Sequence, residues 1–109
     1  MAPAASVITL THNKLEVTRT CLPTLTQTRY APWELIVVDN GSTDGTWEWL
    51  QQFQQETNNR KDAELEVVLI RNDGNIGCST ARNQGIEAAR GNTVAFIDND
   101  IACRSRSWL

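Results

Sequence analysis

Short apolar runs alternate along the chain with longer stretches in which apolar residues recur at helical spacing. Four runs of β type, rich in Val, Ile and Leu, span residues 6–10, 34–38, 65–70 and 93–97. Between them, residues 14–27, 46–56 and 78–90 carry apolar positions at intervals of three and four, which is typical of amphipathic helices. The pattern therefore predicts the element order βαβαβαβ.

This alternation predicts the α/β fold class. The second and third runs are almost continuous in branched apolar residues, as in strands that are covered on both faces. Because crossovers between parallel strands are right-handed, we expect one open, mostly parallel, Rossmann-like sheet. In the first helix we expect Asn13 to be the cap, and Pro23 to cause a kink or an early end near Leu22.

Composition narrows the class of protein. The 109 residues, with 40% hydrophobic and 21% charged residues, suit a single domain over residues 1–109. A net charge of −3 gives no basic surface for nucleic acid. The three cysteines are odd in number and lack a closely spaced pair, which favours a reducing cytosol over a disulfide framework or a zinc site.

The sequence shows neither the basic start of a signal peptide nor an apolar run of about 18 residues for a membrane helix. We therefore expect a cytoplasmic protein, with the inner face of a membrane as the alternative for a full-length parent.

Polar residues follow each predicted strand. They are residues 11–13 after the first strand, 39–42 after the second, 72–75 after the third and 98–100 after the fourth. Ligands of open α/β sheets bind at the carboxyl ends of the strands, so these segments form the expected site. Turn and cap chemistry accounts for most of them, but it accounts less well for the two acids Asp98 and Asp100.

Asp98 and Asp100 point to a metal. Two unit charges ~4 Å apart at an effective dielectric of ~20 interact by about 4 kcal/mol, so paired carboxylates oppose the binding of phosphates. A divalent cation reverses this sign. Hard oxygen ligands suit Mg²⁺ or Mn²⁺, which bridge carboxylates to phosphates.

Four blocks along the chain together resemble one known family. They are Val7–Asn13, Glu34–Thr46, Asn75–Gly85 and Phe96–Asp100, the last matching a DxD motif. Their order and spacing are similar to those of the family 2 glycosyltransferases, which have the GT-A fold. The resemblance implies that this chain is the N-terminal, nucleotide-sugar-binding half of such a fold.

The resemblance also implies roles for individual residues. Asp39 would accept a hydrogen bond from a base N–H, and Thr11 would contribute backbone contacts to the same base. Asp98 would meet the ribose or sugar hydroxyls, Asp100 would bind the metal, and Arg82 would lie near the diphosphate or the donor sugar. Arg82 could equally be a surface cation paired with a neighbouring acid. The nucleotide-sugar-binding set is Thr11, Asn13, Asp39, Arg82 and Asp98, and the metal set is Asp100 and Asp98.

From the resemblance we expect transfer of a sugar from a nucleotide-diphosphate sugar to an acceptor hydroxyl, inverting and metal-dependent. The general base of such enzymes follows the DxD strand, and no acid follows Asp100 here. We therefore expect a truncated donor half that is inactive alone, with an exposed sheet edge that promotes self-association. A non-catalytic nucleotide- or metal-binding module is the alternative. The donor sugar, the base and the acceptor, whether saccharide, lipid or protein, stay open.

Overall fold

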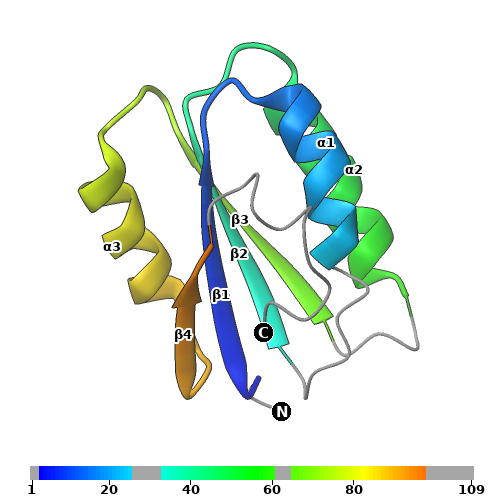
Figure 1. The fold of residues 1–109 in the computed structure, drawn as a ribbon, viewed down its shortest axis with the longest axis vertical. Helices are drawn as coiled ribbons and strands as arrows, with labels where there is room; N and C mark the ends of the chain where they lie inside the picture. Colours follow the sequence, from blue (N-terminus) through cyan, green and yellow to red (C-terminus); the bar gives the residue numbers. More distant parts are fainter. Residues whose placement is uncertain (1–2, 26–32, 61–64, 98–109) are drawn as a thin grey trace.

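The computed structural model describes residues 3–25, 33–60 and 65–97 of the chain. Strands and helices alternate through these residues in the predicted order (Figure 1). The elements are β1 (Ala5–Thr11), α1 (Leu15–Leu25), β2 (Trp33–Asn40), α2 (Thr46–Asn58), β3 (Leu65–Asn72), α3 (Cys78–Ala88) and β4 (Thr93–Phe96).

The strands form one sheet in the order β3-β2-β1-β4, and every pair of neighbours is parallel. Figure 1 shows α1 and α2 on one face of this sheet and α3 on the other. The predicted fold class, an open parallel α/β sheet, is confirmed. β2 is buried at every position, whereas β3 is partly exposed because it lies at the sheet edge.

Each face of the sheet has its own apolar core. The larger cluster lies under α1 and α2 and includes Leu22, Leu35, Leu50 and Phe53. The smaller cluster lies under α3. There the helix approaches the sheet closely: a Cβ on Gly85 would stand 2.6 Å from Ile8 Cγ2. Small residues therefore set the distance between α3 and the sheet.

A buried carboxylate holds the far end of α3 to the amino ends of the strands. Glu34 is fully buried and accepts hydrogen bonds from Ser6 Oγ and from the Arg90 backbone N–H, each at 2.6 Å. Arg90 Nε adds an ion pair at 3.1 Å, and the same guanidinium pairs with Glu66. Hydrogen bonds from Arg90 to Glu66 and Glu34 raise the pKa of Arg90, so this cation stays charged at every ordinary pH.

The start of α1 differs from the prediction. Asn13 adopts a left-handed conformation with φ 51°, and its side-chain oxygen accepts from the Thr43 N–H instead of capping α1. The first N–H of the helix, at Leu15, donates to Asp44 of the following loop. Of the two expectations for Pro23, the early end near Leu22 is wrong, since α1 continues through Pro23 to Leu25, and the kink stays a prediction. Packing against the sheet and α2 outweighs the hydrogen bond that Pro23 cannot make.

Of the three cysteines, Cys78 is an exposed free thiol, and Cys103 lies outside the described residues. Among the described residues, no helix is both long enough and apolar enough to cross a membrane.

Candidate functional site

The carboxyl ends of β1, β2 and β3 meet at one edge of the sheet. The strand register places Thr11 beside Asp39 and Asp39 beside Arg71. Because α1, α2 and α3 follow these three strands directly, their amino ends gather at the same edge (Figure 1). The edge thus combines buried polar side chains with helix N-termini, an arrangement that suits an anionic ligand.

Asp39 is fully buried at the tip of β2. Its Oδ1 accepts hydrogen bonds from the Ser42 N–H at 3.1 Å and from Ser42 Oγ at 2.5 Å. Its Oδ2 is also buried, and it has no hydrogen-bond partner within the described part of the chain. A buried acceptor without a donor costs free energy, so Asp39 presents one oxygen that a ligand N–H could satisfy.

Two predicted site residues at the end of β1 form hydrogen bonds to neighbouring segments of the chain. Thr11 is buried, and its Oγ1 lies 3.1 Å from Thr18 Oγ1 of α1. Asn13 donates its N–H to Ser42 Oγ at 2.8 Å and accepts from the Thr43 N–H at 2.7 Å. Thr11 thus ties the end of β1 to α1, and Asn13 ties the loop after β1 to the loop after β2 that carries Ser42 and Thr43.

Asp44 ties the first two helices to each other. One of its oxygens accepts from the Leu15 N–H at the start of α1, and the other accepts from Thr46 at the start of α2. The hydrogen bond from the Thr46 hydroxyl lowers the pKa of Asp44, and the Leu15 and Thr46 amides lower it further. One carboxylate therefore caps two helix N-termini, a role that sequence reasoning did not assign.

Arg82 lies on α3 beside β4. Its guanidinium carbon lies 5.8 Å from the centre of the Phe96 ring, and no ion pair of Arg82 with an acid occurs among residues 3–25, 33–60 and 65–97. Asp98 and Asp100 lie outside the described residues, as does any contact between them and Arg82. Within the described ranges, no group of three or more His, Cys, Asp or Glu side chains could hold a metal ion.

Sequence reasoning missed Arg71. This residue is the last but one of β3 and lies next to Asp39 in the register. It donates to the Ser42 carbonyl at 3.3 Å, and its guanidinium carbon lies 5.3 Å from the Trp47 ring centre. It places a cation beside the carboxyl ends of the central strands. The signal was present in the sequence as a basic residue directly after the third apolar run.

Sequence reasoning also missed a network of amide side chains. Asn40 bonds to Asn72 and Asn75, and Asn72 forms a reciprocal amide pair with Gln84 of α3. His12 Nδ1 lies 2.8 Å from the Asn40 carbonyl oxygen. The asparagines were interpreted as turn residues, which hid their side-chain role because Asn favours turns in any case.

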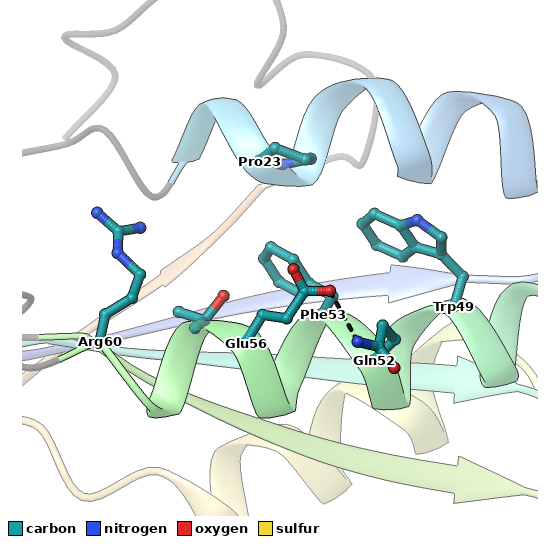
Figure 2. Close-up of a pocket in the computed structure, with 7 residues that line it drawn as sticks. Pro23, Trp49, Gln52, Phe53, Glu56 and Arg60 are labelled. Carbon is teal, nitrogen blue, oxygen red and sulfur yellow. Dashed lines mark hydrogen bonds between the residues drawn. The ribbon is translucent and has the colours of Figure 1, made fainter.

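A separate hollow of about 450 Å³ lies between α1 and α2 (Figure 2). Its lining includes Pro23, Trp49, Phe53, Glu56 and Arg60, and Figure 2 shows Pro23 of α1 above the side chains of α2. Pro23 lies near the carboxyl end of α1 and Arg60 follows the carboxyl end of α2, away from the edge that carries Asp39. The hollow is therefore not part of the candidate site.

The comparisons with known proteins agree with this geometry. The family model described as "Glycosyl transferase family 2" matches residues 6–109. The chain belongs to glycosyl transferase family 2. Among curated family members, it is 38% identical over 109 residues to the glycosyltransferase AglE of Haloferax volcanii. That alignment covers 98% of this chain and 33% of AglE, so the chain spans about a third of the relative's length.

Solved structures of glycosyltransferases share the fold. The mannosyltransferase PcManGT of Pyrobaculum calidifontis, in complex with GDP-Man and Mn²⁺, has a TM-score of 0.79 and 25% identity over 92% of this chain and 28% of its own. TarS 1-349 of S. aureus, in complex with UDP-GlcNAc, has a TM-score of 0.73 and 27% identity over 88% of this chain and 26% of its own. The predicted relation to the GT-A fold is confirmed.

Proposed function

We propose that this family 2 chain is the donor-binding half of a glycosyltransferase and binds a nucleotide-diphosphate sugar at the carboxyl edge of its sheet. The observation that carries the proposal is the buried Asp39, whose Oδ2 has no hydrogen-bond donor among the described residues. Similar structures hold UDP, UDP-GlcNAc or GDP-Man, which supports a nucleotide-sugar ligand. The full-length protein would transfer the sugar to an acceptor hydroxyl.

Asp39 would recognise the base of the nucleotide through a hydrogen bond. Uracil, thymine and guanine each carry a ring N–H that can donate to a carboxylate, and cytosine does not. The unpaired Oδ2 is the atom that would accept this hydrogen bond, and the backbone of Thr11 beside it would contact the same base. Asn13 would hold the neighbouring loop in place through Ser42 and Thr43.

Asp98 and Asp100 would hold Mg²⁺ or Mn²⁺, because carboxylate oxygens are the hard ligands that these ions prefer. The Mn²⁺ in the similar mannosyltransferase complex supports a divalent metal. When bound, the metal would neutralise charge on the diphosphate. Asp98 would also meet ribose or sugar hydroxyls, and Arg82 would lie near the diphosphate.

The reaction would be a direct displacement. The acceptor oxygen would bond to the anomeric carbon as the bond from that carbon to the diphosphate breaks, which inverts the configuration. A general base would take the acceptor proton. That base would come from the acceptor-binding part of the longer protein, so the chain alone would bind the donor and turn over little. A cytoplasmic location stays a prediction.

Calorimetric titration tests the proposal. The chain is titrated with UDP, dTDP and GDP, each with and without Mn²⁺. In Asp39→Asn, the amide N–H₂ takes the place of the accepting oxygen, so two hydrogen-bond donors face each other. The affinity for the nucleotides should therefore fall at least about tenfold. Asp100→Ala should abolish the effect of Mn²⁺. The matched control is Glu56→Gln, which makes the same change at an exposed carboxylate of α2 away from the strand ends.

Absence of binding for all three nucleotides, or affinity unchanged in Asp39→Asn, would contradict the proposal. The alternative is a stand-alone module that binds nucleotide or metal without catalysis. A reading frame that continues into an acid-bearing acceptor region favours the enzyme, and a stop codon after Leu109 favours the module.

A further inference from the structure

We propose that the amide side chains of Asn40, Asn72, Asn75 and Gln84 position the first two turns of α3, and through them Arg82, for the diphosphate of the donor. The inference rests on the proposed function and adds to it a set of positioning residues. None of the four is required to touch the ligand.

The network holds the first turn of α3 from the end of β2. Asn40 Oδ1 accepts from the Ile76 N–H at 3.4 Å, and Asn40 Nδ2 donates to Asn75 Oδ1 at 2.9 Å. The same Asn75 oxygen accepts from the Gly77 N–H at 3.0 Å, one residue before the helix begins. The backbone that starts α3 is thus fixed to a buried side chain of the central sheet.

A second tie lies one turn further along the helix. Asn72 and Gln84 exchange two hydrogen bonds, with Asn72 Nδ2 donating at 2.9 Å and Gln84 Nε2 donating at 2.8 Å. Asn72 Nδ2 also donates to Asn40 Oδ1 at 3.0 Å, which joins both ties into one network. Gln84 is two residues from Arg82, so the tie acts on the turn that carries the cation.

Apolar side chains would be the simpler choice at this interface. The rest of the contact between α3 and the sheet is built from Ile8, Ile36, Val38 and Ala81. Buried amides cost free energy unless they are paired, and they gain little net stability when they are. Their hydrogen bonds are directional, however, and therefore fix how far α3 can slide or rotate, which contacts between small apolar residues do not.

The geometry around Arg82 fits such a role. The network holds α3 at its first turns, and the Phe96 ring lies 5.8 Å from the Arg82 guanidinium on the other side. Phe96 ends β4, two residues before Asp98. The guanidinium is therefore held beside the strand that leads into the predicted metal ligands, where a diphosphate would lie.

The test compares two probes, UDP and uridine, on the chain and on Gln84→Leu. Uridine offers the base contact to Asp39 but no phosphate. Displacement of Arg82 should therefore lower the affinity for UDP and leave the affinity for uridine unchanged. We expect the affinity for UDP to fall about tenfold, as for the loss of one charged hydrogen bond, and the affinity for uridine to stay within about twofold. Unfolding of the variant would lower the affinities for UDP and uridine together.

Two further variants complete the design. The double variant Asn72→Gln/Gln84→Asn exchanges the side-chain lengths and keeps the amide pair, so it should recover most of the UDP affinity. Gln52→Leu removes an exposed glutamine whose side chain donates a hydrogen bond to Glu56 on α2. This control variant should change the affinity for neither UDP nor uridine. Equal losses for UDP and uridine in Gln84→Leu, or no loss for UDP, would overturn the positioning role. If the unsubstituted chain binds neither probe nor the other two nucleotides, the proposed function itself fails.

Discussion

Replacing Ser6 by Ala tests the buried contact that joins the end of α3 to the sheet. Ser6 is fully buried, its hydroxyl donates to the Glu34 carboxylate at 2.6 Å, and the same oxygen accepts from the Gly91 N–H at 2.8 Å. The substitution removes a single oxygen atom, so the loss of packing is small. What it removes is a hydrogen bond to a buried charge and the partner of a backbone N–H.

A hydrogen bond to a charged group contributes about 1.5–3 kcal/mol, and an amide left without its partner adds a smaller penalty where water can reach it. We therefore expect Ser6→Ala to lower the free energy of unfolding by about 2–4 kcal/mol. This is a large share of the ~5–15 kcal/mol that stabilises a typical domain.

Urea unfolding followed by circular dichroism measures this change. With a slope of about 1–3 kcal/mol per M, the midpoint should fall by roughly 1 M or more. Ser79→Ala is the matched control, because Ser79 is exposed in the first turn of α3 and its loss should stay within about 0.5 kcal/mol. If Ser6→Ala changed the free energy of unfolding by no more than Ser79→Ala does, Glu34 would not depend on the Ser6 hydroxyl and the reasoning would be refuted.

Three further outcomes are expected. Gly85→Ala should destabilise the chain by about 1–3 kcal/mol in thermal unfolding, because its Cβ would stand 2.6 Å from Ile8 Cγ2. The pKa of Asp44 lies below its usual value of 3.8, so the ionised carboxylate contributes its full stabilisation above pH 3.8. This stabilisation is lost as the pH falls through the lower pKa of the folded state. In acid unfolding, the free energy of unfolding of Asp44→Ala should therefore fall less steeply over that pH range. Light scattering should show association that grows with concentration, and Val94→Lys on the exposed strand β4 should reduce it, whereas a clean monomer at high concentration would contradict edge pairing.

The elements were predictable because their signals are local. Apolar period and turn residues lie within a few positions of each other, so the strands and helices begin and end close to where the pattern places them. The errors at Asn13 and Pro23 have one cause. Whether a helix is capped by its own preceding residue, or continues through a proline, depends on what packs against it, and that partner is remote in sequence.

The candidate site was predictable to the extent that strand ends and family blocks mark it. Asp39 was named from its block, whereas Arg71 was missed because a basic residue after a strand is common on any surface. The amides Asn40 and Asn72 were interpreted as turn formers, since nothing in a linear pattern shows that they face each other across a distance of 32 residues.

The sequence by itself determined the order of elements, the edge of the sheet that carries polar residues, and the resemblance to the family, because these depend on local pattern and on ordered motifs. Only the tertiary structure decided that Asp39 is buried and that one of its oxygens has no partner within the described ranges. The same holds for Asp44, which accepts hydrogen bonds at the start of two helices, and for Glu34, which meets Ser6 and Arg90. The physical reason is that burial and hydrogen-bond pairing are properties of groups brought together from 28 or 56 residues apart, and no neighbour along the chain reports them.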